Sequence, residues 1–352
     1  MDNKINKILL LFCGGTISMH KNEQTGALDI AHGAEQLFKL EPRIIELAEI
    51  DVISISNIDS TNMSPREWER IVSAVEENYE KYDGFVVTIG TNTLAYASSA
   101  VSFAMQNLGK PVVFTGAQIP AEAISTDARN NLVNALRVSS MNLSGVFVVF
   151  GSKIMTGSRA KKLSESELDA FGTFNESDFG EISIGIKLNQ QNLGRHNNKP
   201  DFKNGFNDNI VSLTCIPGLN PDSLRSLIDS GTRGIILRGF GSGDIPYSYL
   251  PLLDYAREKE VPVIVTTQCR GSTVLGLNDP GLKALEAGVI QAFDMSMESM
   301  STKLMWLLAQ NTRYSDFKKA FHNNMTGEIN IKKTKFFLNK ELRNLVDYSD
   351  YE

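Results

Sequence analysis

The sequence contains little cysteine and little histidine, and neither residue type forms a cluster. Three cysteines, Cys13, Cys215 and Cys269, are widely spaced along 352 residues without a CxxC pair. An odd number of scattered cysteines is typical of a reducing compartment rather than of a disulfide-bonded secreted protein. The four histidines are isolated and form no HExxH motif, so the sequence predicts no metal site.

Excess positive charge and long apolar runs are also missing. The chain carries 35 basic and 41 acidic residues, a formal net charge of −6, so no positive field is available to hold a nucleic acid. The apolar run at 8–12 is short and lacks a small-residue cleavage site, which indicates a strand rather than a signal peptide. No run is long enough to cross a bilayer. We therefore expect a soluble cytoplasmic protein with neither a nucleic-acid nor a membrane partner.

The length and the 42% hydrophobic content correspond to two α/β domains. In the first half, short β-branched runs alternate with helical patterns. The predicted strands are 7–12, 52–56, 84–88, 111–115 and 145–150. Such alternation predicts right-handed βαβ units in a larger N-terminal, doubly wound and mostly parallel sheet. One helix is marked clearly, with Ser64 as N-cap, Pro65 at its first position and Glu67 completing a capping box.

The composition changes around 188–209, where asparagine, lysine, glycine and Pro200 accumulate. This is the pattern of an interdomain linker. Strand and helix patterns resume from residue 210 and predict a smaller C-terminal parallel α/β domain. The predicted organisation is 1–187 for the catalytic α/β domain, 188–209 for the linker, 210–328 for the second domain and 329–352 for a tail without a fold signal.

The first candidate site follows the first predicted strand. In an open parallel sheet, ligands bind beyond the carboxyl ends of the strands. There, Gly14 and Gly15 allow a tight turn that presents the Thr16 hydroxyl beside backbone amide donors. Taken alone, the tripeptide is more typical of an ordinary strand-to-helix turn.

Three further loops carry hydroxyl, amide and lysine side chains. They are Asp59-Ser60-Thr61-Asn62, Ile89-Gly90-Thr91-Asn92-Thr93 and Gly157-Ser158-Arg159-Ala160-Lys161-Lys162. Each has a simpler explanation, as capping residues or as solvated surface lysines. Their joint occurrence, without a GxSxG elbow, P-loop or GxGxxG fingerprint, favours nucleophilic catalysis by a threonine that needs no cofactor.

Several motifs along the chain, taken in their order, resemble those of a known family. The motifs are Gly14-Gly15-Thr16-Ile17, Asp59-Ser60, Tyr82-Asp83-Gly84-Phe85-Val86-Val87-Thr88, Gly90-Thr91, Leu94-Ala95-Tyr96, Thr115-Gly116-Ala117-Gln118-Ile119-Pro120, Asp127-Ala128-Arg129, and Asp294-Met295 with Glu298 and Thr302-Lys303-Leu304. From about residue 7 to about residue 328 the chain resembles the bacterial-type L-asparaginases, and most closely their cytoplasmic type I branch. The resemblance implies two α/β domains, an active site between subunits, and a homodimer or homotetramer acting on a small-molecule amide.

The resemblance also implies roles for individual residues. Thr16 corresponds to the nucleophile that forms an acyl-enzyme, and Thr91 and Lys162 to the second hydroxyl and its lysine partner. The substrate-binding positions that it implies are Asp59, Ser60, Thr61, Asn92, Ala117 and Glu298. Lys162 is preferred to Lys161 because of its spacing from Asp169-Ala170-Phe171.

Two departures from the family pattern bear on the substrate. The family has His-Gly-Thr-Asp-Thr where this chain has Ile89-Gly90-Thr91-Asn92-Thr93, so the carboxylate that contacts the substrate's ammonium is replaced by a neutral amide. A charge-assisted contact is worth roughly 1.5–3 kcal/mol, or about 10- to 100-fold in affinity. The loss also predicts a lower pKa for Lys162. In addition, no tyrosine occurs near Gly26 or Ala27, where the family often has one.

Three functions remain open at this point. The first is hydrolysis of L-asparagine to L-aspartate and ammonia. The second is the same chemistry on an amide without a free ammonium, such as an N-substituted asparagine, which the neutral Asn92 suits. The third is a catalytically weak relative that binds an amino acid or amide.

Overall fold

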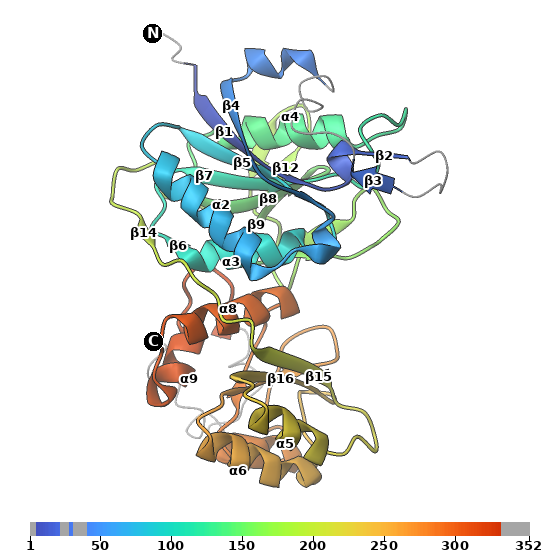
Figure 1. Cartoon of the computed structure of the whole chain (residues 1–352), viewed down its shortest axis with the longest axis vertical. Helices are drawn as coiled ribbons and strands as arrows, with labels where there is room; N and C mark the ends of the chain where they lie inside the picture. The colour runs from blue at the N-terminus through green and yellow to red at the C-terminus, as the bar shows by residue number, and fades with distance from the viewer. Residues whose placement is uncertain (1–4, 22–27, 31–40, 332–352) are drawn as a thin grey trace. The chain divides into compact units, whose positions relative to one another are not determined.

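The computed structural model describes residues 5–21, 28–30 and 41–331, and the chain divides into two compact units, Met1–Gly205 and Phe206–Glu352 (Figure 1). The first unit is built on an eight-stranded sheet in the order β13-β12-β9-β8-β7-β5-β1-β4. The strands are β1 (Lys7–Gly14), β4 (Glu49–Ile58), β5 (Gly84–Thr88), β7 (Pro111–Thr115), β8 (Gly145–Phe150), β9 (Lys153–Thr156), β12 (Gly180–Ile182) and β13 (Ile186–Leu188).

Five neighbouring strands, from β4 to β8, are parallel, which confirms the predicted mostly parallel sheet. The predicted strands 84–88, 111–115 and 145–150 coincide with β5, β7 and β8. These strands read as continuous apolar runs because both faces of a covered parallel sheet are buried. The antiparallel strands β9, β12 and β13 extend the sheet at one edge.

Helices cover both faces of this sheet. Helix α4 (Ala128–Ser139) lies on one face, and α2 (Pro65–Asn78) and α3 (Leu94–Ala104) lie on the other (Figure 1). The predicted capping box begins α2, since the Ser64 backbone N–H donates to the Glu67 carboxylate at 2.9 Å. On the α4 face, Leu132 and Leu136 pack in one core cluster with Phe12 of β1. Burying each such side chain contributes about 1.5–3 kcal/mol.

Short elements complete the first unit. They are η1 (Thr16–Ser18), β2 (Met19–Lys21), β3 (Leu28–Ile30), η2 (Pro42–Glu46), η3 (Ser60–Asn62), β6 (Met105–Gln106), β10 (Ala160–Lys162), β11 (Phe171–Thr173) and β14 (Asp201–Phe202). Strand β10 pairs with β11 as an antiparallel hairpin.

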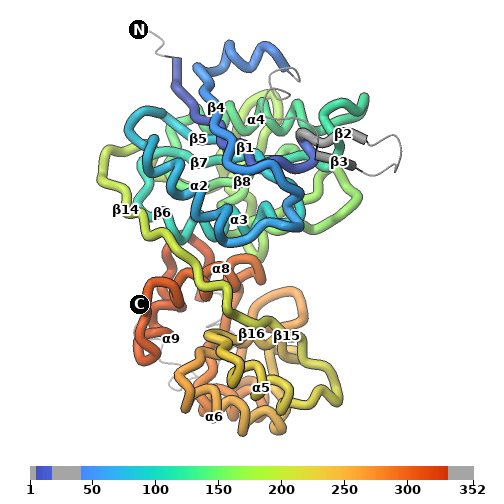
Figure 2. Tube along the Cα trace, viewed as in Figure 1, coloured from blue at the N-terminus to red at the C-terminus, as the bar shows by residue number. Residues whose placement is uncertain are grey.

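The segment 188–209, expected as a linker, contains the boundary between the two units. Its residues up to 205 belong to the first unit, and β14 within it pairs with β6 (Figure 2). Arg195 further attaches the segment, because its guanidinium donates to the carbonyls of Met141 and Ser139 at 2.9 Å each. The part of the segment up to residue 205 is therefore attached to the first unit through β14 and Arg195.

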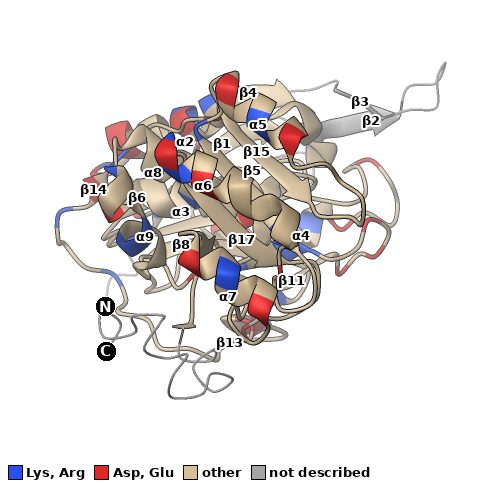
Figure 3. Ribbon diagram, turned by 90° about the horizontal axis from the view of Figure 1, so that it is seen from below, with Lys and Arg blue, Asp and Glu red and all other residues tan. Residues whose placement is uncertain are grey.

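The second unit contains a four-stranded parallel sheet, β15-β16-β17-β18. Its elements are β15 (Ile210–Thr214), α5 (Asp222–Asp229), β16 (Gly234–Gly239), η4 (Tyr247–Tyr249), α6 (Leu250–Glu258), β17 (Val263–Thr267), α7 (Asp279–Glu286), β18 (Ile290–Gln291), α8 (Met297–Ala309) and α9 (Tyr314–His322). The expectation of a smaller parallel α/β domain is confirmed. Acidic and basic residues alternate over helices such as α6 and α7 (Figure 3).

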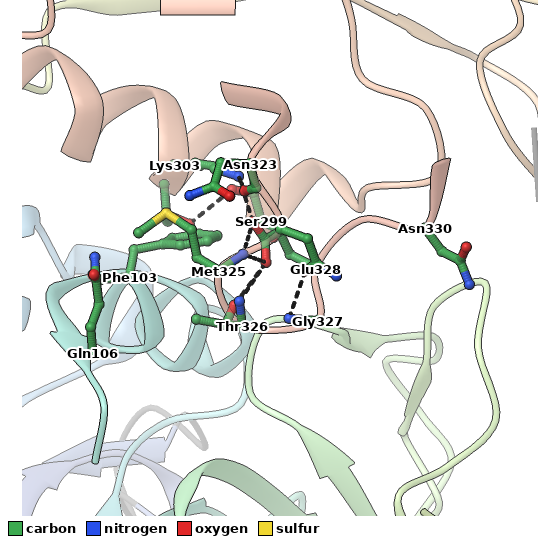
Figure 4. Close-up of polar contacts among 12 residues, drawn as sticks. Phe103, Gln106, Ser299, Lys303, Asn323, Met325, Thr326, Gly327, Glu328 and Asn330 are labelled. Atoms are coloured by element: carbon green, nitrogen blue, oxygen red, sulfur yellow. Dashed lines mark hydrogen bonds and ion pairs between the residues drawn. The ribbon is translucent and has the colours of Figure 1, made fainter. Parts of the chain in front are cut away.

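A buried ion pair lies within the second unit. Lys303 of α8 pairs with Glu328, and both side chains are fully buried (Figure 4). Lys303 Nζ also donates to the Asn323 carbonyl at 2.6 Å, and the Glu328 carboxylate accepts from the backbone N–H of Thr326 at 2.8 Å. The charge of each partner is compensated, as burial requires.

Among the described residues, no helix has the length and apolarity needed to cross a membrane.

Candidate active site

The ends of three neighbouring strands meet at the carboxyl edge of the first unit's sheet. Gly14 and Gly15 have positive φ angles of 84° and 89°. A Cβ atom added to Gly15 would lie 2.3 Å from the backbone nitrogen of Gly90, and one added to Gly90 would lie 2.5 Å from Ser60 Oγ. Glycine is therefore required for the turns after β1 and β5 to approach each other and the η3 turn.

A cavity of about 150 Å³ opens at this meeting point. Its wall consists of Gly15, Thr16, Asp59, Ser60, Gly90, Thr91, Asn92, Gln118 and Lys162. The structure thus brings together residues from all four loops that the sequence singled out. Six of the predicted site residues lie in this one wall.

Lys162 is hydrogen-bonded to two of its neighbours in the cavity. Its Nζ donates to Thr91 Oγ1 at 2.8 Å and to Asn92 Oδ1 at 3.0 Å. Thr91 is 6% exposed, and its hydroxyl donates to Gln118 Oε1 at 3.0 Å. Lysine and a hydroxyl in direct contact form the pairing that activates an oxygen for nucleophilic or proton-transfer chemistry.

Burial lowers the pKa of Lys162, while the negative charge of Glu165 opposes that change. The lower pKa agrees with the sequence-based expectation, but its cause differs. The expectation relied on the absence of an anionic neighbour, whereas desolvation is the larger effect. Glu165, on the loop after β10, is an anionic neighbour that the sequence argument overlooked.

Comparison with known proteins identifies the family. The "Asparaginase, N-terminal" family model matches residues 7–193, and "Glutaminase/Asparaginase C-terminal domain" matches residues 209–321. The chain belongs to the asparaginase family. The resemblance drawn from the sequence motifs is thereby confirmed.

Individual relatives agree with this assignment. An L-asparaginase of Thermococcus kodakarensis is 38% identical over 92% of this chain and 99% of that protein. L-asparaginase 1 of Escherichia coli K12 is 32% identical over 92% of this chain and 97% of that protein. One of the subunits of the glutamyl-tRNA(Gln) amidotransferase of Pyrococcus abyssi is also 32% identical, over 92% of this chain and 76% of that protein.

Solved structures confirm the fold. The thermostable L-asparaginase from Thermococcus kodakarensis superimposes with a TM-score of 0.85 at 37% identity, covering 92% of this chain and 99% of that chain. L-asparaginase I from Vibrio cholerae gives a TM-score of 0.84 at 32% identity, covering 93% of this chain and 100% of that chain.

The sequence left open whether the Asp59 loop caps a helix or lines a binding site, and in the structure it does both. Asp59 is the N-cap of η3, since its carboxylate accepts from the Thr61 backbone N–H at 2.7 Å, and it also lines the cavity. Thr61 lies outside the cavity wall but contacts a wall residue, because its Oγ1 accepts a hydrogen bond from Asn92 Nδ2 at 3.1 Å. The Asn92 amide is consequently held between Thr61 and Lys162.

Helix α3 supports the turn that leads to Lys162. The hydroxyls of Ser98 and Ser99 both donate to the Gly157 carbonyl, at 2.8 and 3.3 Å. A Cβ atom on Gly157 would lie 2.8 Å from Ser102 Oγ, so the turn before β10 packs tightly on the helix. Lys161 takes a different direction, with Nζ 5.4 Å from the centre of the Phe174 ring.

Besides Thr61, two predicted substrate-binding positions lie outside the cavity wall. Ala117 is fully buried outside the cavity wall, and its neighbour Gln118 occupies the wall instead. Glu298 belongs to the second unit, in the first turn of α8, and is 8% exposed. Gly26 and Ala27 lie outside the described residues.

Gln118 is the functional candidate that the sequence argument missed. The available signal was its place directly after β7, in the motif Thr115-Gly116-Ala117-Gln118-Ile119-Pro120. Within the part of the chain that the structure describes, no group of three or more histidine, cysteine, aspartate or glutamate side chains is arranged to hold a metal ion.

Proposed function

We propose that this protein hydrolyses the side-chain amide of L-asparagine to give L-aspartate and ammonia, with Thr16 as nucleophile. The observation that carries the proposal is that Thr16, Thr91 and Lys162 line one cavity, with Lys162 Nζ 2.8 Å from Thr91 Oγ1. Membership of the asparaginase family, and relatives named L-asparaginase, support the same reaction.

The reaction proceeds in two steps. Thr16 Oγ attacks the amide carbon, the hydroxyl proton is transferred to the departing nitrogen, and the carbon–nitrogen bond breaks to release ammonia. The resulting ester is then attacked by water, which releases aspartate and restores the Thr16 hydroxyl. Backbone N–H groups in the glycine-rich wall are suited to stabilising the oxyanion of each tetrahedral intermediate.

The Thr91–Lys162 pair supplies proton transfer. Burial lowers the pKa of Lys162 and so increases the neutral fraction of its amine near neutral pH. A neutral amine accepts a proton through the Thr91 hydroxyl, whereas the ammonium form returns one. Moving the lysine pKa toward the working pH favours both directions of transfer.

The Asn92 geometry favours a second candidate substrate. Among the nine residues of the cavity wall, Asp59 is the only carboxylate. Asn92 Oδ1 accepts from Lys162 and Nδ2 donates to Thr61, so this side chain has its second N–H, rather than a negative charge, to offer a ligand. An asparagine whose α-nitrogen is acylated has no ammonium to neutralise, and the same mechanism would cleave its side-chain amide.

We also propose a cytoplasmic homodimer or homotetramer in which Glu298 contributes to substrate binding. The family resemblance supports this assembly, and a structural relative is described as a probable cytoplasmic L-asparaginase from Campylobacter jejuni. Sedimentation of the purified protein, with and without Glu298→Gln, tests the assembly separately from ammonia release.

Ammonia release from L-asparagine, L-glutamine and N-acetyl-L-asparagine tests the reaction. Turnover of L-asparagine supports the first candidate, and turnover of only the acetylated substrate supports the second. If no amide is hydrolysed while L-asparagine raises the melting temperature, the protein is a binding relative and the hydrolase proposal is wrong.

A further inference from the structure

The side-chain amide of Gln118 connects the cavity to the loop that follows Lys162. Its Oε1 accepts the hydrogen bond from Thr91 Oγ1 at 3.0 Å. Its Nε2 donates to the backbone carbonyls of Glu165 and Glu167, both at 3.2 Å. One planar group therefore contacts a hydroxyl of the site and two points on the loop 163–169.

Gln118 is itself held firmly by the start of α4. The backbone N–H groups of Gln118 and Ile119 donate to the two Asp127 carboxylate oxygens at 3.0 and 2.9 Å. Asn131 Nδ2 donates to the same carboxylate at 3.0 Å. The Gln118 amide consequently extends from a fixed backbone, as a positioning group requires.

The loop is closed on itself but exposed to solvent. The Leu163 N–H donates to the Ala170 carbonyl at 2.7 Å and closes the base. Ser164 Oγ accepts from the N–H groups of Ser166 and Glu167 at 3.2 and 3.1 Å. The Gln118 amide adds to these bonds by joining the loop's carbonyls to the cavity wall.

The three hydrogen bonds together determine where the Thr91 proton lies. Backbone carbonyls accept only, so Glu165 and Glu167 fix which end of the Gln118 amide is the nitrogen and direct Oε1 to Thr91. The Thr91 hydroxyl has one hydrogen, which it donates to Gln118. Its oxygen is then free to accept from the ammonium form of Lys162.

We propose that Gln118 is a positioning residue that holds the Thr91 hydrogen away from Lys162 and, with the other end of the same amide, fixes the loop 163–169 at the cavity. This inference rests on the proposed hydrolase function of the site. For Thr91 to give its proton to a neutral Lys162, the hydroxyl rotates away from Gln118. Gln118 therefore stabilises the arrangement in which Lys162 is charged.

The charged groups to consider around Lys162 come from the cavity wall and from the loop 163–169, which also carries Glu167 and Asp169, the latter paired with Lys153 at 2.8 Å. Asp59 shares the cavity wall, and Glu165 acts from the loop. Of the elements packed on β10, helix α3 carries Tyr96 as its titratable side chain, and β11 carries none. A substitution of Gln118 is therefore expected to change the pKa of Lys162 by a measurable amount.

Two substitutions separate the two ends of the amide. Gln118→Glu keeps an acceptor for Thr91, adds a negative charge and loses both donors to the loop. Gln118→Leu loses the acceptor as well. We expect the Lys162 pKa, measured by NMR of the lysine side chains, to rise in Gln118→Glu and to fall in Gln118→Leu, each by about 0.5–1 pH unit.

The loop provides an independent measurement. A glutamate-specific protease applied to the native protein cleaves after Glu165 and Glu167 only when the loop opens locally. The cleavage rate therefore reports how often the loop 163–169 opens. Losing two hydrogen bonds is expected to raise this cleavage rate about tenfold in both variants. Gln190→Leu is the matched control, because Gln190 Nε2 makes one bond to the Ser177 carbonyl outside the cavity and the loop.

The inference is overturned if loop cleavage is unchanged in both variants, or if the Lys162 pKa shifts in the same direction in both. A fall in melting temperature equal to that of Gln190→Leu, with neither other change, also overturns it. Because neither measurement uses catalysis, a wild-type protein that releases no ammonia would refute the proposed function without deciding the role of Gln118. With an active wild type, kcat is expected to fall while KM stays within about twofold.

Discussion

Lys162 Nζ lies 3.0 Å from Asn92 Oδ1, so the cation in the cavity is paired with a neutral amide. An aspartate at position 92 would place a negative charge at that distance from the ammonium. It would also present an anionic acceptor beside the substrate. The substrate preference and the lysine titration are therefore linked through one residue.

Asn92→Asp is expected to increase kcat/KM for L-asparagine. A carboxylate gives a charge-assisted contact to the substrate ammonium that is worth roughly 1.5–3 kcal/mol, which corresponds to about 10- to 100-fold. N-acetyl-L-asparagine has no ammonium and should gain nothing. Initial rates of ammonia release on both substrates measure the difference.

Asn189→Asp is the control for net charge, since Asn189 is exposed and bonds the Asp178 carbonyl outside the cavity. The interpretation of Asn92 fails if Asn92→Asp improves both substrates equally, or if Asn189→Asp has the same effect.

Thr16→Ala is expected to lower ammonia release by about 10³-fold or more, because it removes the attacking oxygen. Thr16→Ser keeps a hydroxyl and should retain measurable turnover. Rapid quenching followed by mass spectrometry should detect an ester on the Thr16 peptide of the wild type. Undiminished turnover in Thr16→Ala, or an ester on a different peptide, would contradict the assigned nucleophile.

Much of the fold was predictable because its strands are local patterns of apolar residues. Strands β5, β7 and β8 read as buried runs. The predicted strands 7–12 and 52–56 correspond to β1 and β4, with ends that differ from the observed ones by at most three residues. Strand β9, which lies between β12 and β8, is not predicted from the sequence, because the turn before it depends on Gly151, at φ 57°. Nothing in a four-residue strand distinguishes it from a loop.

The candidate site was partly predictable for a similar reason. Thr16 and Thr91 follow strands directly, so recognising the strand locates the residue. Ala117 and Gln118 show the limit, since adjacent residues after β7 point in different directions and tertiary packing decides which reaches the cavity. Glu165 was overlooked because a loop residue distant from a strand end carries no pattern.

The buried ion pair predicts an asymmetric response to substitution. Lys303→Met leaves the Glu328 carboxylate buried without its cation, which is expected to destabilise the second unit by about 3–5 kcal/mol. Adding Glu328→Gln removes the uncompensated charge and should recover part of that loss. Urea unfolding followed by the fluorescence of Trp306 in α8, in a Trp68→Phe background, reports on this unit.

The control for that experiment is Lys283→Met, which breaks the exposed pair with Glu286 and should cost at most about 1 kcal/mol. Equal losses at Lys303 and Lys283 would show that burial does not determine the strength of the Lys303 pair.

Because His322 is buried, we expect the protein to lose stability in weak acid. Its ring is buried against Phe293, with Nε2 2.8 Å from the Gln291 carbonyl, and burial lowers its pKa to about 3. In the unfolded chain His322 binds a proton near pH 6.5. The stability gained by burying the neutral His322 ring is therefore fully present above pH 6.5. It is lost progressively as the pH falls toward 3, because the unfolded state then holds more protons.

We expect the free energy of unfolding of the second unit, followed through Trp306, to fall by about 1.4 kcal/mol per pH unit from this group between pH 6 and pH 4. His322→Phe is less stable at pH 7, since the Gln291 carbonyl loses its donor, but its slope in that interval should be smaller by the same amount. NMR of the histidine rings should show that His322 does not titrate above pH 5. A His322 signal that titrates near pH 6.5 in the folded protein would refute this assignment.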